Sequence, residues 1–133
     1  MHSIHTMFFK YVTSIFSYMK VGIVLATNSL PQVEKALRLA NRSLGNGSKV
    51  ELFLLFEGVR LFELTSKSKH AEDLFNEFTE KGGKVTACRA CASAKGVGNG
   101  LRCEMSSLAT AATLRCRSDR YYFVTKRNKI KEN

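Results

Sequence analysis

The stretch MKVGIVLATNSLPQVEKALRLANRSLGNG, residues 19–47, joins an apolar run to a segment with helical periodicity. The run VGIVL (21–25) is apolar throughout, which is typical of a strand buried on both faces. Beyond it, apolar residues recur at steps of three and four, which predicts a helix with one buried face: Val33, Ala36, Leu37, Ala40 and Leu44. A buried strand followed by an amphipathic helix is the repeating unit of an α/β fold.

The ends of this helix carry recognisable signals. Ser29 and Gln32 have the spacing of a capping box, and Pro31 is tolerated in a first helical turn. Gly45 and Gly47 follow the last periodic residue and can end the helix.

The alternation of strand and helix continues along the chain. KVELFLLF (49–56), KVTAC (84–88) and RYYFV (120–124) have the composition of further strands. Helical spacing marks two more segments: Ala71, Leu74, Phe75 and Phe78, ended by Gly82 and Gly83, and inward-facing Leu108, Ala109 and Ala112, capped by Ser106 or Ser107. Such alternation implies right-handed crossovers. We expect a three-layer, flavodoxin-like α/β fold with a mostly parallel central sheet of about five strands flanked by helices.

The two ends of the chain differ from this domain, which we place at residues 19–125. Residues 1–18 have apolar side chains at the spacing of an amphipathic helix. This extension could dock on the domain, bind another subunit or lie on a membrane surface, or Met19 could be the natural start. Its polar face carries little basic charge, which argues against the membrane. We expect residues 126–133, a basic tail, to be a solvated end.

The composition excludes several classes of protein. The chain has 133 residues, of which 44% are hydrophobic, and this suits one globular domain. It has no apolar run of the length needed to cross a bilayer. Its start lacks the basic region and the cleavage site of a signal peptide. Four cysteines are too few for a disulfide framework. We therefore expect a cytoplasmic protein.

The charge is strongly basic, since 21 Lys and Arg residues stand against 11 Asp and Glu, a net charge of +10. That charge would suit nucleic acid, an anionic surface or an acidic protein partner. The chain lacks the interleaved basic and aromatic strip of a nucleic-acid surface, however, because Tyr121 and Tyr122 belong to the predicted last strand. The sequence therefore does not indicate nucleic-acid binding.

The segment KVTACRACASAKGVGNG (84–100) carries the chemistry, because it places a C-x-x-C motif directly after a predicted strand. Ligands and reactive groups gather at the carboxyl ends of strands in open parallel sheets, and Cys88 is expected there. A helix that begins beside it, together with Arg89, Lys95 and Arg102, would favour the thiolate of Cys88. Without that setting, a cysteine at a strand end is more often a small buried residue.

Other readings of C-x-x-C fit less well. A zinc site normally needs a second close pair of ligands, whereas Cys103 and Cys116 are single and widely separated. Thioredoxin-like folds place a proline downstream of the motif, and the one proline, Pro31, lies upstream. Dithiol chemistry on another fold remains open.

Two segments could in principle bind phosphate. The glycines Gly96, Gly98 and Gly100 follow the short helix instead of opening one, which favours a flexible loop. The segment ATNSLPQ (26–32) is a better anion cradle, although Ser29 is already assigned to the helix cap.

The order and spacing of several motifs resemble the DsrE/DsrF-like family, which includes sulfur-relay subunits. The resemblance covers about residues 20 to 124, and five segments carry it: KVGIVLAT, LFLLFEGVRL (52–61), CRACASAKGV (88–97), MSSLATAATL (105–114) and SDRYYFV (118–124). It implies assembly into trimers or hexamers, homomeric or mixed, and a cysteine that accepts sulfane sulfur as a persulfide. Cys88 matches that cysteine, and Cys91 matches a second one found in part of the family. Arg115, Cys116 and Arg117 depart from the pattern by giving the last helix a polar exit.

Two hypotheses follow from the residues and the resemblance. In the first, the chain is a sulfur carrier or sulfurtransferase in which Cys88 takes sulfur from a donor protein and yields it to an acceptor, without metal or organic cofactor. Cys91 would resolve the persulfide or shape the site, and Arg89 and Lys95 would stabilise thiolate or attract an anionic donor. In the second, it is a non-catalytic oligomeric binding module that uses the loop at Gly96, Gly98 and Gly100 or its N-terminal helix. The sequence does not decide whether the protein is an enzyme.

Overall fold

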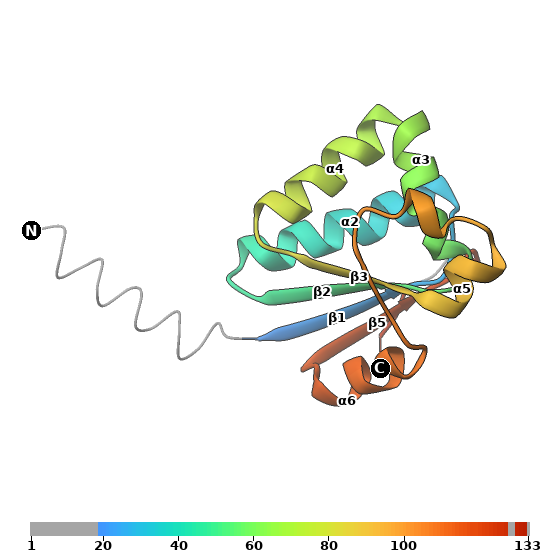
Figure 1. Ribbon diagram of the computed structural model, residues 1–133. Coiled ribbons are helices and arrows are strands. Elements are labelled where there is room, and N and C mark those ends of the chain that lie inside the picture. Colours follow the sequence, from blue (N-terminus) through green and yellow to red (C-terminus); the bar gives the residue numbers. More distant parts are fainter. Residues whose placement is uncertain (1–18, 128–129, 133) are drawn as a thin grey trace, which may run out of the picture.

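The computed structural model describes residues 19–127 and 130–132 and has a central six-stranded sheet with the order β4-β3-β2-β1-β5-β6 (Figure 1). Strands β1 to β5 run parallel, and β6 pairs antiparallel with β5 at one edge. The strands are β1 (Lys20–Leu25), β2 (Lys49–Leu54), β3 (Lys84–Cys88), β4 (Glu104–Ser106), β5 (Arg120–Val124) and β6 (Ile130–Glu132). The mostly parallel sheet predicted from the sequence is confirmed.

Helices cover both faces of the sheet and complete three layers (Figure 1). Helices α2 (Leu30–Gly45), α3 (Leu61–Lys67) and α4 (Lys69–Glu80) lie over one face, and α6 (Ala109–Arg117) lies over the other. The short helix α5 (Arg89–Ala94) follows β3 at the carboxyl end of the sheet. Two 3₁₀ turns, η1 (Phe56–Arg60) and η2 (Gly98–Gly100), lie in the connections.

The hydrophobic core is divided between the two faces of the sheet. The larger cluster contains Ile23, Leu25, Leu37, Leu52 and Phe78 and joins the sheet to α2 and α4. The smaller cluster lies on the face covered by α6 and is formed by Val24, Phe53, Leu55, Cys88, Leu114 and Tyr121. Because β1 and β2 contribute side chains to both clusters, they read as continuous apolar runs in the sequence.

The predicted helix after β1 is confirmed, but its capping box is wrong. Val33, Ala36, Leu37 and Ala40 are buried along one face of α2. Ser29 is the N-cap residue, yet its side chain makes no capping hydrogen bond. Its backbone N–H instead donates to Oγ1 of buried Thr27 at 3.0 Å. A side-chain to backbone hydrogen bond across two residues therefore replaces the expected capping box.

The last helix is shorter than expected and packs through a different residue. Leu108, Ala109 and Ala112, predicted to face inward, are exposed, and the buried side chain of α6 is Leu114. A Cβ atom on Gly22 of β1 would lie 2.8 Å from Cγ of Leu114, so the helix rests on the sheet at this glycine. The helix therefore packs on the sheet mainly through Leu114, with Ala111 partly buried beside the same cluster.

The ends of the described chain also differ from the prediction. Within the basic tail, Ile130–Glu132 form β6 on the edge of β5, where a strand would otherwise leave backbone groups unpaired. The predicted amphipathic helix at residues 1–18 lies outside the described residues. Across the described part of the chain, no helix has the length and apolar character needed to cross a membrane.

The polar exit of α6, which departs from the family pattern, has a structural role. Arg117 donates two hydrogen bonds to the Glu51 carboxylate, at 2.8 and 3.1 Å, and so ties the end of α6 to the middle of β2. These hydrogen bonds hold the pKa of Glu51 below its ordinary value of 4.5, although burial acts in the opposite direction. The Arg115 guanidinium lies 6.0 Å from the ring centre of Tyr121.

We expect Arg117→Ala to lower the free energy of unfolding by about 1 kcal/mol at pH 7, because the pair is half-exposed on the arginine side. The folded chain binds a proton at Glu51 less readily than the unfolded chain does, so the contribution of the pair is present above pH 4.5 and is lost as the pH falls further. Urea unfolding at pH 7 and pH 3.5 measures both effects. Arg115→Ala is the control, and an equal loss in the two variants, or no pH dependence of the difference between them, would contradict this assignment.

Candidate functional site

Cys88 is the last residue of β3 and the N-cap residue of α5, so it lies at the carboxyl end of the sheet as predicted. Its exposed fraction is 0%, because it packs in the smaller core cluster below α6. The position was predictable from the strand, but full burial was not.

Cys91 lies one helical turn further and completes the motif. The backbone N–H of Cys91 donates to Sγ of Cys88 at 3.4 Å. The Cys88 thiol also lies beside the sulfur of Cys91 and affects its pKa. Unlike Cys88, Cys91 is partly exposed, and both cysteines are free thiols. The motif therefore gives a buried and a partly exposed sulfur side by side.

Burial raises the pKa of the Cys91 thiol above its ordinary value of 9.0, and the neighbouring Cys88 thiol raises it further. The backbone N–H of Phe56 and the charge of Lys95 act in the opposite direction. The sequence predicted basic neighbours that favour the thiolate of Cys88. At Cys91 they do not prevail, because the loss of water outweighs them.

The turn η1, which the sequence analysis missed, forms the wall beside Cys91. Phe56 has φ 51°, in the left-handed region that bulky residues rarely adopt, and its side chain is 52% exposed. Gly58 follows, and a Cβ atom there would lie 1.9 Å from the backbone oxygen of Leu25. The signal that could have found this turn is FEGV directly after a buried strand, since glycine in that place marks a close backbone approach.

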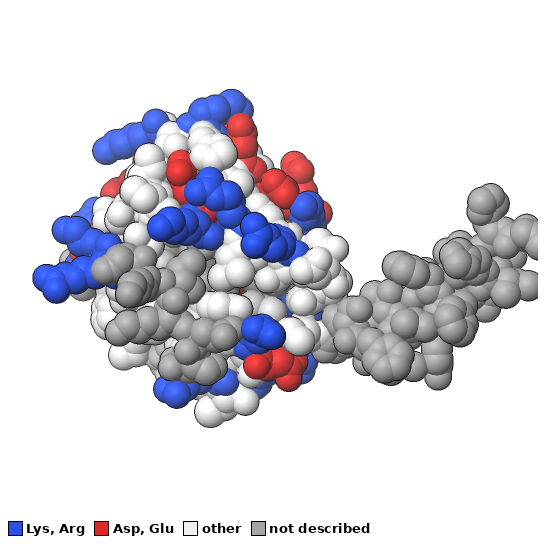
Figure 2. Space-filling model, turned by 180° about the vertical axis from the view of Figure 1, so that it is seen from behind, with Lys and Arg blue, Asp and Glu red and all other residues white. Residues whose placement is uncertain are grey.

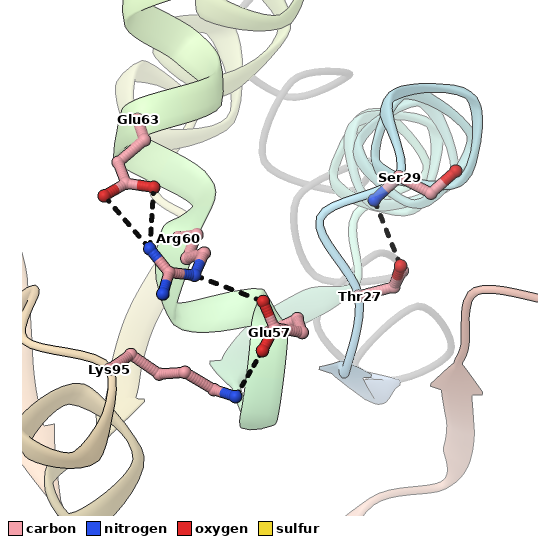
Figure 3. A network of polar contacts seen from close by, with 6 residues as sticks. All are labelled: Thr27, Ser29, Glu57, Arg60, Glu63 and Lys95. Atoms are coloured by element: carbon pink, nitrogen blue, oxygen red, sulfur yellow. Dashed lines mark hydrogen bonds and ion pairs between the residues drawn. The ribbon is translucent and has the colours of Figure 1, made fainter.

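The predicted cations are all engaged with other groups. Lys95 forms an ion pair with Glu57, which also accepts a hydrogen bond from Arg60 at 3.1 Å (Figure 3). The hydrogen bond from Lys95 holds the pKa of Glu57 below its ordinary value. Arg89 donates to the backbone oxygen of Met105 at 3.1 Å, on the neighbouring strand β4. Glu57 therefore compensates much of the charge that Lys95 was expected to supply.

Arg102 does not join this site. Its guanidinium donates to Oγ1 of Thr65 at 3.1 Å and lies 4.9 Å from the ring centre of Phe62, in the layer of α3 and α4.

The basic side chains are spread over the surface: Figure 2 shows lysines and arginines in several separate groups over the face seen from behind.

The two segments considered for phosphate binding have different backbone arrangements. Gly96 has φ 68° and ends α5, as its N–H donates to the Ser93 oxygen at 3.1 Å. Together with Gly100 it lines a cavity of about 330 Å³ against α3, whereas Gly98 begins η2. In the segment 26–32, Thr27 already accepts the Ser29 N–H (Figure 3), so this donor is not available to an anion.

Cys103 and Cys116 do not complete a metal site with the motif. Among residues 19–127 and 130–132, no three His, Cys, Asp or Glu side chains gather as ligands for a metal ion would. Burial raises the pKa of the Cys103 thiol to about 11, and Cys116 is exposed on α6.

The protein is thus a three-layer α/β protein with a C-x-x-C motif at the carboxyl end of its parallel sheet. Residues 19–123 match the DsrE/DsrF-like family. The chain belongs to this family, and the resemblance seen in its motifs is confirmed. A search among curated proteins found no match.

The solved structures that share the fold include the following two. The YchN protein of E. coli aligns with a TM-score of 0.61 at 16% identity, covering 80% of this chain and 98% of that one. The conserved protein of unknown function BT1422 from Bacteroides thetaiotaomicron aligns with a TM-score of 0.59 at 18% identity, covering 74% of this chain and 87% of that one. At these identities the likeness establishes the α/β architecture, while function rests on the residues of this chain.

Proposed function

We propose that this protein is a sulfur carrier in which the Cys88–Cys91 pair accepts sulfane sulfur, Cys88 holds it as a persulfide, and a partner thiol receives it. The observation that carries the proposal is the contact of two free thiols at the carboxyl end of the sheet, in a chain of the DsrE/DsrF-like family. Burial of Cys88 suits a storage role, because a persulfide there is protected from other thiols in solution.

The chemistry needs no oxidant and no cofactor. A cysteine thiolate attacks the outer sulfur of the donor's persulfide, and the donor departs as a thiolate. The outer sulfur of the Cys88 persulfide then passes, directly or through Cys91, to an acceptor thiolate by the same exchange, and Cys88 departs as a thiolate. Alternatively, the Cys91 thiolate attacks the inner sulfur of that persulfide, which forms a Cys88–Cys91 disulfide and releases hydrosulfide.

The proposal is tested by sulfur retention. We expect the reduced protein, incubated with glutathione persulfide and freed of excess donor, to gain one sulfur atom in its intact mass. Cys88→Ser should abolish the retained sulfur, because the remaining partly exposed thiol does not protect a persulfide.

The matched control is the double variant Cys103→Ser, Cys116→Ser, which should retain sulfur as the wild type does. A wild type that neither gains sulfur nor forms the Cys88–Cys91 disulfide, or a Cys88→Ser variant that retains as much sulfur as the wild type, would sink the proposal. The first outcome would favour the non-catalytic binding module instead.

A further inference from the structure

The two sulfurs of the motif differ in access, and this difference bears on how sulfur reaches Cys88. Cys88 is 0% exposed and lies under α6, among Phe53, Leu114 and Tyr121. A donor persulfide must reach the attacking thiol directly, since the exchange needs the attacking, transferred and leaving sulfur atoms in line. Cys91 is partly exposed and meets that requirement in the fold as it stands.

Two groups beside Cys91 act to lower its pKa, the Phe56 N–H and Lys95, although burial raises it overall. The turn that carries the Phe56 N–H is held in a left-handed conformation at φ 51°. Strained backbone of this kind persists only where the surrounding structure determines it, and it is concentrated at functional sites. Here the turn is locked by Gly58 against Leu25 and by the ion pair of Glu57 with Lys95.

The path from Cys91 to Cys88 is short. The Cys91 N–H lies 3.4 Å from Sγ of Cys88, and the two thiols are within hydrogen-bonding reach. A sulfur atom added to Cys91 therefore lies beside the Cys88 sulfur that is to attack it.

We propose that Cys91 is the first acceptor and that sulfur moves inward from Cys91 to Cys88. In the first step the Cys91 thiolate bonds to the outer sulfur of the donor, whose S–S bond breaks and whose thiolate leaves. In the second step the Cys88 thiolate bonds to that same outer sulfur, and Cys91 departs as a thiolate. The sulfur keeps its oxidation state throughout, and delivery to an acceptor reverses the order. This route rests on the proposed function and assigns Cys91 as a catalytic residue.

The sequence allows the two steps to be followed separately. Trypsin cleaves after Lys84, Arg89 and Lys95, so VTACR contains Cys88 and ACASAK contains Cys91. The reduced protein is mixed with glutathione persulfide, quenched with iodoacetamide at successive times and digested. We expect the additional sulfur to appear first in ACASAK and then in VTACR.

Two variants test the order independently. Cys91→Ser should slow the loading of Cys88 by glutathione persulfide by about 10-fold or more, because the buried thiol then has to react directly. Cys88→Ser should still load Cys91 at early times and fail to retain the sulfur. Thermal unfolding of each variant identifies any loss of folding, and Cys103→Ser is the matched control.

The outcomes separate this route from the proposed function. Sulfur that appears first in VTACR, or a Cys91→Ser variant that loads at the wild-type rate, overturns the route and leaves the carrier function standing. Absence of sulfur from both peptides of the wild type overturns the carrier function, and the route with it.

Discussion

Alanine in place of Gly58 is expected to lower the free energy of unfolding by about 3 kcal/mol, the range of a forced backbone clash. The new Cβ would lie 1.9 Å from the oxygen and 2.8 Å from the carbonyl carbon of Leu25. That oxygen accepts the Leu55 N–H at 2.9 Å, so it cannot retreat without loss of a hydrogen bond that joins the ends of β1 and β2. Urea unfolding followed by circular dichroism measures the change.

Gly100→Ala is the matched control, because a Cβ there meets nothing within 4 Å. We expect its free energy of unfolding to stay within about 0.5 kcal/mol of the wild type. If Gly58→Ala were equally harmless, the close approach of η1 to β1 would be wrong, and with it the account of how the Phe56 N–H is aimed at Cys91.

The sequence predicted those parts of the fold that carry a strong local pattern. The strands β1, β2, β3 and β5 are apolar, and α2 and α4 show helical spacing, so each could be found within its own residues. The strands β4 and β6 have three residues each and show no such pattern. They form because the edges of β3 and β5 offer unpaired backbone groups, which is a property of the assembled sheet.

The turn from Phe56 to Lys67 was missed for a different reason. KVELFLLF reads as one strand, but the left-handed residue Phe56 ends it after Leu54 and opens η1 and α3. A left-handed backbone conformation at Phe56 could not be predicted from the apolar pattern. Bulky residues such as phenylalanine rarely adopt that conformation, so the sequence gives no signal for it.

The site was predictable in position and not in its electrostatics. A C-x-x-C motif after a strand places Cys88 at the carboxyl end of the sheet. Its burial depends on Leu114 and Tyr121, which come from later elements, and the charge of Lys95 is compensated by Glu57 from an earlier one. These pairings are set by the tertiary structure, so residue types near the motif could not predict them.

Phe53→Ala is expected to lower the free energy of unfolding by about 4 kcal/mol, as is usual for a fully buried phenylalanine. Phe53 is the penultimate residue of β2, is 0% exposed, and packs in the smaller cluster with Leu114, Tyr121 and Cys88. The cavity left on that face would also admit small reagents to Cys88. We therefore expect the alkylation of Cys88 by iodoacetamide to become faster relative to Cys103, as measured on their separate tryptic peptides.

Phe56→Ala is the internal control, since it removes the same side chain three residues later, where 52% of it is exposed. Its free energy of unfolding should change by no more than about 0.5 kcal/mol, and the alkylation of Cys88 should not change. The milder Phe53→Leu keeps the experiment informative if Phe53→Ala fails to fold, because it opens a smaller space with a smaller loss of stability. Unchanged alkylation of Cys88 in a folded Phe53 variant would show that the packing around Phe53 does not limit access to this thiol. The inward route through Cys91 would then lose the structural reason given for it.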